Sequence, residues 1–128
     1  MNFRYTFKKA ERISEQREID YLFSQNTSFA VYPLRVIYTL QKPLSGADVA
    51  VLISVSKKKI RKAVHRNRIK RLIRESYRIN KHSLIEFVKE KEIGLLVAFL
   101  FQDNKLCTYK EIDEALQKSI ELLKAKLS

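Results

Sequence analysis

The sequence predicts one α+β domain, spanning residues 1–128, in which a small sheet packs against helices. The length of 128 residues and the 45% hydrophobic content are enough to build one ordinary core. Runs rich in β-branched and aromatic residues alternate with segments of helical periodicity, as α+β proteins require. Only two Gly and two Pro are present, and neither a linker nor a repeat is evident.

The first predicted helix is the stretch SEQREIDYLFSQN. Ser14 is its candidate N-cap, and Ile19, Leu22 and Phe23 follow at the spacing of one helical face. Asn26 tolerates the left-handed conformation that often ends a helix. The pattern therefore predicts a short helix that stops near Asn26.

Three strands are predicted after this helix. FAVYPLRVIYTL and ADVAVLISV are separated by the turn signal KPLSGAD, so we expect them to be neighbouring antiparallel strands. Pro33, within the first run, suits a sheet edge or a bulge. The apolar run IGLLVAFLF at residues 93–101 is far shorter than the roughly 20 residues that span a bilayer, and it predicts a buried strand.

Two further helices are predicted from capping-box spacings. Ser83 with Glu86 opens a short helical piece before the last strand, and Thr108 with Glu111 opens the C-terminal helix. That last helix should pack on the sheet through one apolar stripe, which comprises Tyr109, Ile112, Leu116, Ile120, Leu123 and Leu127. From the residues alone, the order of elements is α-β-β-(α)-β-α.

Positive charge is concentrated in one segment. Residues 57–81 hold twelve Lys or Arg and one acid, Glu75, a net charge of +11, whereas the whole chain carries +12. A charge that served solubility would be spread over the surface, so this clustering indicates a polyanionic partner. Nucleic acid and an anionic membrane surface are the two candidate partners, and a solvated helix face is the alternative without a partner.

A helix from about Ala63 to Asn80 sorts this segment into two arcs. The apolar arc holds Ile69, Leu72, Ile73, Ser76 and Tyr77. The other arc, about 140° wide at 100° per residue, holds Arg66, Asn67, Lys70, Arg71, Arg74 and Arg78. Guanidinium groups match phosphate with forked donors, and the apolar arc has no Trp or Phe for lipid, so nucleic acid is favoured over a membrane.

The basic segment resembles the protein component of bacterial ribonuclease P. The matching residues are SVSKK at the end of a strand and AVHRNRIKRLIRES, which carries the family's Arg-Asn-Arg signature. FKKAERI, IDYLFSQN, RVIYTL and the C-terminal helix extend the resemblance over nearly the whole chain. The chain departs from the family by one extra residue between Lys58 and Ala63 and by Ile19, where Phe is common.

The resemblance implies an α-β-β-(β)-α-β-α sandwich of a small mixed sheet and helices, like the second domain of ribosomal protein S5, with a possible left-handed βαβ crossover. It implies a protein subunit of the endoribonuclease ribonuclease P, acting as a monomer in a 1:1 complex with the catalytic RNA subunit, which removes the 5′ leader of precursor tRNA. The implied RNA-binding residues are Lys57, Lys58, Arg66, Asn67, Arg68, Lys70, Arg71 and Arg74. The implied leader-binding residues are Phe23 and Tyr38, since single-stranded RNA stacks on aromatic faces.

No catalytic or metal-binding residue is expected in the protein itself. His65 and His82 with the lone Cys107 give no zinc-site spacing, and two glycines are too few for a phosphate loop. The resemblance supplies Mg²⁺, bound mainly by RNA in the holoenzyme. With one cysteine and no signal peptide in MNFRYTFKKAERI, a cytoplasmic location is expected.

Two other functions remain open. A structural RNA-binding protein of the ribosomal type has the same composition, and only the aromatic pair Phe23 and Tyr38 argues against it. A DNA-binding helix is the second alternative, but the chain lacks a helix-turn-helix partner and a dimerisation heptad.

Overall fold

The computed structural model describes residues 16–24, 27–41 and 48–128. The helices are α1 (Gln16–Ser24), α2 (Ala63–Asn80), α3 (His82–Glu90) and α4 (Tyr109–Leu127). The strands are β1 (Ser28–Val31), β2 (Leu34–Gln41), β3 (Val49–Val55) and β4 (Gly94–Phe101). The predicted caps Ser14 and Asn26 of the first helix lie outside the described residues. The α+β class and the bounds predicted for the basic helix are confirmed.

The four strands form one mixed sheet in the order β1-β2-β4-β3. β2 pairs with β1 and β4 in the antiparallel sense, and β3 runs parallel to β4. The prediction that FAVYPLRVIYTL and ADVAVLISV are neighbouring antiparallel strands is therefore wrong, because β4 lies between β2 and β3. β4 is the most apolar strand and is buried along nearly its whole length. A central place in the sheet suits it, because there it buries the most apolar surface.

The run FAVYPLRVIYTL forms two strands rather than one. β1 and β2 make a hairpin whose turn contains the cis peptide bond between Tyr32 and Pro33. Proline has no N–H to donate, so a ladder cannot continue through this position. Pro33 thus separates two strands, and the sheet gains a fourth.

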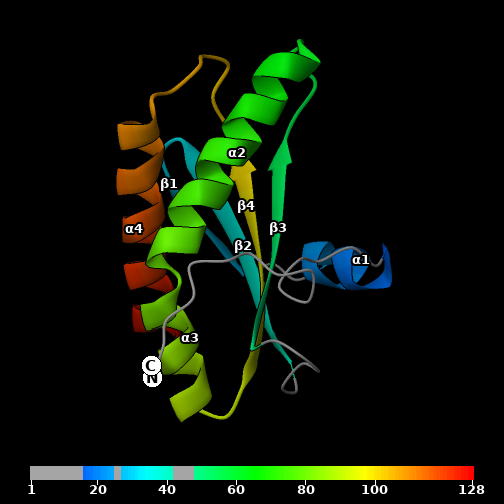
Figure 1. Cartoon of the computed structure of the whole chain (residues 1–128). Coiled ribbons are helices and arrows are strands. Elements are labelled where there is room, and N and C mark those ends of the chain that lie inside the picture. The colour runs from blue at the N-terminus through cyan, green and yellow to red at the C-terminus, as the bar shows by residue number, and fades with distance from the viewer. Residues whose placement is uncertain (1–15, 25–26, 42–47) are drawn as a thin grey trace.

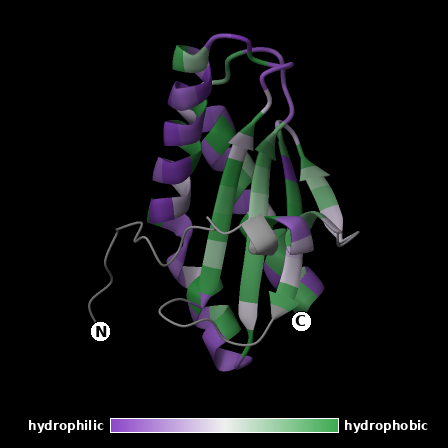
Figure 2. Ribbon diagram, turned by 90° about the vertical axis from the view of Figure 1, so that its right-hand side faces the viewer, coloured by the Kyte–Doolittle hydropathy of each residue, from purple (hydrophilic) through white to green (hydrophobic). Residues whose placement is uncertain are grey.

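Helices cover both faces of the sheet. α2, α3 and α4 lie on one face, and α1 crosses the other (Figures 1 and 2). Alternate residues of each strand point to opposite faces. Val97 and Phe99 of β4 belong to the main core under α2 and α4, whereas Leu96 and Ala98 pack with Leu22 of α1.

The connection from β3 to β4 is left-handed. Both strands point upward in Figure 1, α2 lies in front of the sheet, and β4 lies to the left of β3. Nearly all such parallel connections are right-handed, so this one is an exception to a strong rule. The handedness that the resemblance implied is the one observed.

The two predicted capping boxes have different outcomes. Thr108 caps α4 as predicted: its side chain accepts a hydrogen bond from the Glu111 N–H, and the Glu111 carboxylate accepts one from the Thr108 N–H, each at 3.2 Å. The box predicted at Ser83 is wrong. α3 starts at His82 after Lys81, which has helical φ and ψ and makes no side-chain cap, because α3 follows α2 with a single residue between them.

Asp113 of α4 joins α4 to α2 through a polar network. Its carboxylate accepts hydrogen bonds from the Ser76 hydroxyl at 2.6 Å and from the Asn80 amide at 3.0 Å. A hydroxyl that is fully buried needs such a partner. This bond explains why the serine within the apolar arc of α2 is compatible with a packed core.

We predict that Asp113→Ala lowers the free energy of unfolding by about 1–3 kcal/mol, because the buried Ser76 hydroxyl loses its acceptor. Gln117→Ala is the matched control, since Gln117 also donates to Asp113, at 2.7 Å, but from an exposed position. It should change stability by no more than about 0.5 kcal/mol. Urea unfolding measures both, and equal losses would show that the network is not what stabilises the helix pair.

Asp103, in the segment between β4 and α4, connects that segment to the β1–β2 turn. Its carboxylate accepts a hydrogen bond from the Tyr32 hydroxyl and a second from the Lys105 N–H at 3.2 Å. The bond from Tyr32 is the main reason that the pKa of Asp103 is lowered. The same bond raises the pKa of Tyr32 to about 12.

The Tyr32–Asp103 bond should therefore stabilise the fold only within a window of pH. A lowered carboxyl pKa contributes stability above the ordinary Asp value of about 3.9, and this is lost as the pH falls through the folded pKa. The raised pKa of Tyr32 contributes stability at pH values below the ordinary tyrosine pKa of about 10. This stability is lost as the pH rises through the pKa of the tyrosine in the folded protein. We expect Tyr32→Phe to lower the melting temperature most near neutral pH and least in acid. A difference that does not vary with pH would contradict this assignment.

Candidate nucleic-acid interface

Residues 56–62, here called the basic loop, connect β3 to α2. The Ser56 carbonyl accepts hydrogen bonds from the N–H groups of Lys59 and Ile60, at 3.2 and 3.0 Å, and the Ser56 hydroxyl accepts one from Lys58. Ile60 is buried in the core and anchors the loop. This tight turn leaves five cationic side chains exposed to solvent: Lys57, Lys58, Lys59, Arg61 and Lys62.

Arg66, in the first turns of α2, contacts the basic loop. Its Nη1 donates to the carbonyl oxygens of Ile60 and Arg61, at 2.9 and 2.6 Å. Its side chain is therefore half-buried, in contrast with the exposed arginines further along the helix.

α2 presents its two predicted arcs to the core and to solvent. Ile69, Ile73 and Tyr77 are buried, and the Tyr77 ring lies 5.9 Å from that of Phe99 in β4. The residues turned outward, here called the basic face, border an open hollow of about 650 Å³ together with Val64 and His65. The basic face consists of Asn67, Arg68, Lys70, Arg71 and Arg74. The buried stripe thus fixes which way the cations point.

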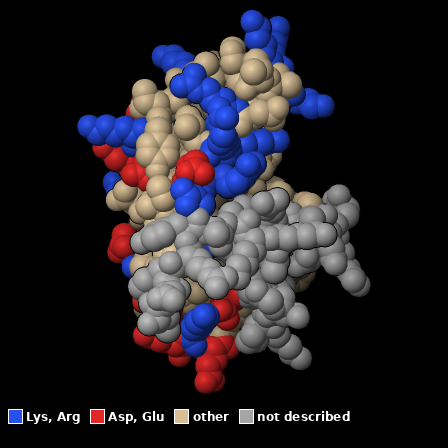
Figure 3. All heavy atoms as spheres, viewed as in Figure 1, with Lys and Arg blue, Asp and Glu red and all other residues tan. Residues whose placement is uncertain are grey.

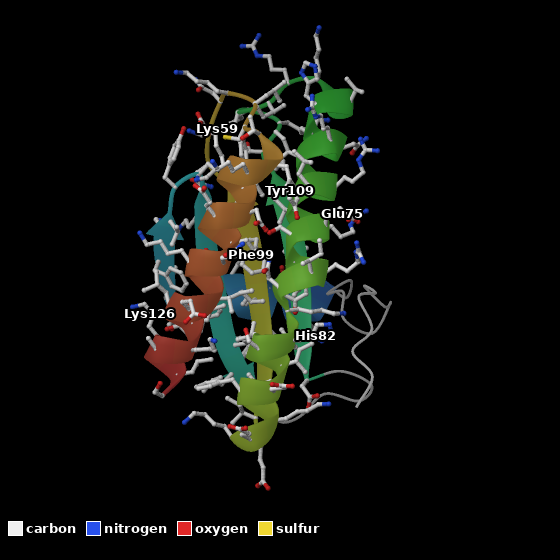
Figure 4. All side chains as sticks on the ribbon, turned by 60° about the vertical axis from the view of Figure 1, so that its left-hand side comes forward. Lys59, Glu75, His82, Phe99, Tyr109 and Lys126 are labelled. Carbon is white, nitrogen blue, oxygen red and sulfur yellow. The ribbon has the colours of Figure 1, made fainter. Side chains whose placement is uncertain are left out.

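Lys and Arg atoms gather along α2 and at the end of the molecule where it begins, whereas Asp and Glu atoms gather at the α3 end (Figure 3). Glu75 is the one acid of α2, and it pairs with Arg78 at 2.9 Å. The hydrogen bond from Arg78 is the main reason that the pKa of Glu75 is lowered. Glu75 is therefore ion-paired with Arg78, and it lies away from Lys59 of the basic loop (Figure 4).

Several residues of this surface were not among the predicted site residues. Lys59, Arg61 and Lys62 extend the loop, and Val64 is 68% exposed beside the basic face. The unbroken run KKKIRK was the available signal for the cations. Exposure of an isolated valine on a helix could not be read from the sequence.

The structure corrects the predicted pairing of Phe23 and Tyr38 in one platform. Phe23, on α1, is 44% exposed, whereas Tyr38 is only 8% exposed and packs with Phe29, their ring centroids 6.0 Å apart. Tyr38 belongs to the core under α4, and α1 lies on the opposite face of the sheet. Odd and even strand positions face opposite sides, so the sheet separates the two rings.

On the α1 face, the sheet stays partly exposed between α1 and the basic loop. Leu52, Ser54 and Leu100 are half-buried there, and Arg35 is exposed. Arg35 donates to the Ser28 hydroxyl at 3.0 Å. This sheet surface therefore lies between α1, which carries Phe23, and Lys57 and Lys58, which follow β3.

In the described part of the chain, no three His, Cys, Asp or Glu side chains gather in a group that could hold a metal ion. Cys107 is buried, and burial raises the pKa of its thiol to about 11. Such a thiol is a poor nucleophile. Across the same described residues, no helix is long and apolar enough to cross a membrane.

The fold and the charged surface define a class of protein: a small basic α+β protein with one cationic helix face and loop. The family model of ribonuclease P matches residues 7–124. The ribonuclease P protein component of Porphyromonas gingivalis strain ATCC 33277 is 40% identical over 116 residues, which cover 91% of this chain and 85% of that protein. The Clostridioides difficile protein component is 29% identical, over 90% of this chain and 93% of that protein.

A solved structure of the Staphylococcus aureus ribonuclease P protein superposes with a TM-score of 0.70, at 28% identity, covering 91% of this chain and 97% of that chain. A mutant of that protein with defective mRNA degradation activity gives a TM-score of 0.72 at 27% identity, over 91% and 90% of the two chains. The chain belongs to the ribonuclease P protein family.

Proposed function

We propose that this chain is the protein subunit of ribonuclease P and binds the catalytic RNA through the basic loop and the basic face. The RNA performs the hydrolysis that removes the 5′ leader of precursor tRNA, and the protein assists it. The observation that carries the proposal is the surface formed by the basic loop and the basic face. Its ten positions are nine Lys or Arg cations and Asn67, whose amide can also donate to phosphate, and Arg66 lies between loop and helix.

Magnesium, in this proposal, is held by RNA phosphates. The basic loop and the basic face contain no Asp or Glu that could supply carboxylate ligands to the ion. The ion supplies Lewis-acid chemistry at the scissile phosphate when bound. The contribution of this chain is charge: its cations lower the repulsion between RNA subunit and substrate, and thus the magnesium that assembly requires.

The leader of the precursor is proposed to lie on the α1 face. Phe23 offers an exposed ring for stacking, and the half-buried sheet positions next to α1 lead toward Lys57 and Lys58. Tyr38 is left out of this proposal, because its ring packs in the core of the opposite face. The protein is proposed to act in the cytoplasm as a monomer in a 1:1 complex with the RNA.

A structural RNA-binding protein of the ribosomal type is the competing function, and the cleavage reaction separates the two. With the cognate RNA subunit at low magnesium, adding this protein should raise the rate of 5′-leader removal from a labelled precursor tRNA. The same rates with and without protein would reject the proposed function and leave only RNA binding. Mature tRNA, which has no leader, serves as the substrate blank.

We predict that Arg71→Ala weakens binding to the RNA subunit by about 1–3 kcal/mol, because charge-assisted contacts to phosphate are lost while the apolar stripe of α2 is untouched. The log of the affinity should fall linearly with log salt, less steeply in the variant by about 0.7–0.9 per lost phosphate contact. Lys126→Ala, on α4, is the control and should bind normally. A wild-type affinity independent of salt would rule out phosphate contacts.

We predict that Phe23→Ala weakens binding of precursor tRNA to the assembled enzyme by about 1–3 kcal/mol, the value of a base stacked on an aromatic ring. Affinity for mature tRNA and for the RNA subunit should be unchanged, since neither has a leader. Tyr21→Ala is the matched control, because Tyr21 is also exposed, at 48%, but flanks the buried Leu22 on the other side of α1. Equal losses for precursor and mature tRNA in a folded Phe23→Ala variant would remove the leader site.

A further inference from the structure

Arg66 lies between the two basic elements and bonds to the backbone of one of them. Its Nη1 donates to the carbonyl oxygens of Ile60 and Arg61, which lie six and five residues earlier in the chain. On the other side of the turn, the Ser56 carbonyl accepts hydrogen bonds from the N–H groups of Lys59 and Ile60, so Ile60 is bonded to both Ser56 and Arg66. Together, Ser56 and Arg66 hold the loop from both ends.

The basic loop needs such a restraint because of its charge. Lys57, Lys58 and Lys59 follow one another at its start, and Arg61 and Lys62 at its end, with no acid between them. Like charges at this spacing repel, which favours an extended, fluctuating loop over a tight turn. Only Ile60, buried in the core, offers the loop an apolar anchor.

The two bonds leave the charge of Arg66 in place. Carbonyl oxygens are neutral acceptors, so the guanidinium keeps its full positive charge. Both bonds use Nη1, which has two hydrogens, so three further N–H groups on Nη2 and Nε are not used by them. Arg66 therefore differs from Arg71, which is exposed, in that its side chain is committed to the backbone before any RNA arrives.

We propose that Arg66 is a positioning residue: it presets the basic loop in the conformation that binds RNA, so that its contribution to affinity passes through the loop lysines. This inference rests on the proposed function, because the preset loop is assumed to meet the RNA subunit. Preorganisation raises affinity by removing an ordering cost from the binding step.

The first test uses the protein alone. Hydrogen exchange of the Lys59 and Ile60 amides reports on the loop turn, since both donate to Ser56. In Arg66→Ala both amides should exchange faster than in wild type, by about threefold or more if one net hydrogen bond is lost. Arg71→Ala is the matched control and should leave them unchanged. Unaltered exchange in a folded Arg66→Ala variant would overturn the proposal.

Arg66→Lys gives a second variant in case the alanine variant does not fold. It keeps the charge but loses the fork that reaches two carbonyls, and Arg to Lys is not conservative at such a site. The same two amides should again exchange faster than in wild type. Exchange at the wild-type rate would count against positioning by the guanidinium.

The second test is a double-mutant cycle on affinity for the ribonuclease P RNA subunit. The changes are Arg66→Ala and the loop pair Lys57→Ala with Lys58→Ala, singly and combined. If Arg66 acts through the loop, replacing Lys57 and Lys58 should weaken RNA binding less in the Arg66→Ala background than in wild type. The two fold-losses in affinity should differ by about threefold or more. The same cycle with Arg71→Ala should be additive within about twofold.

The outcomes separate the two hypotheses. Additive losses in both cycles would overturn the positioning role while leaving RNA binding established. No loss from Arg71→Ala or from the loop pair would reject the proposed RNA interface, and the exchange measurement on the free protein would still decide whether Arg66 holds the loop.

Discussion

The packing of α2 on the sheet determines how the rest of this molecule presents its charge. Ile69, Ile73 and Tyr77 are buried against the core, and Tyr77 meets Phe99 at the centre of the sheet. A helix that buries one stripe must expose the opposite one. Because the buried stripe and the cations share one 18-residue helix, hydrophobic burial fixes the direction of the basic face.

The left-handed connection adds a second constraint. It places α2 on the same face of the sheet as α4, and the basic loop projects from the end of β3 (Figure 1). The bond between Ser76 and Asp113, at 2.6 Å, then sets α2 beside α4. The basic loop and the basic face become one continuous surface because these contacts leave both on the outside.

Local signals predicted the helices well. The bounds of α2 are those read from its periodicity, since 18 residues sample five turns, and the cap at Thr108 follows from a spacing of three residues.

Strand pairing was missed because β4 lies between β2 and β3 in the sheet, although the residues it pairs with are more than forty positions away in the sequence. Tyr38 was misplaced because the face of a strand depends on register, which a single strand does not encode. The contact of Arg66 with the loop was missed because it depends on how the chain turns between β3 and α2, which the pattern of residues does not encode.

The most direct test of the proposed interface is the reactivity of individual lysines toward an acylating reagent, measured by mass spectrometry with and without the RNA subunit. Lys57, Lys58, Lys59, Lys62 and Lys70 should be protected by RNA. Lys89, near the end of α3, and Lys126, near the end of α4 and away from Lys59 in Figure 4, should react as before. Protection of Lys89 and Lys126 with continued reactivity of the loop lysines would contradict the account.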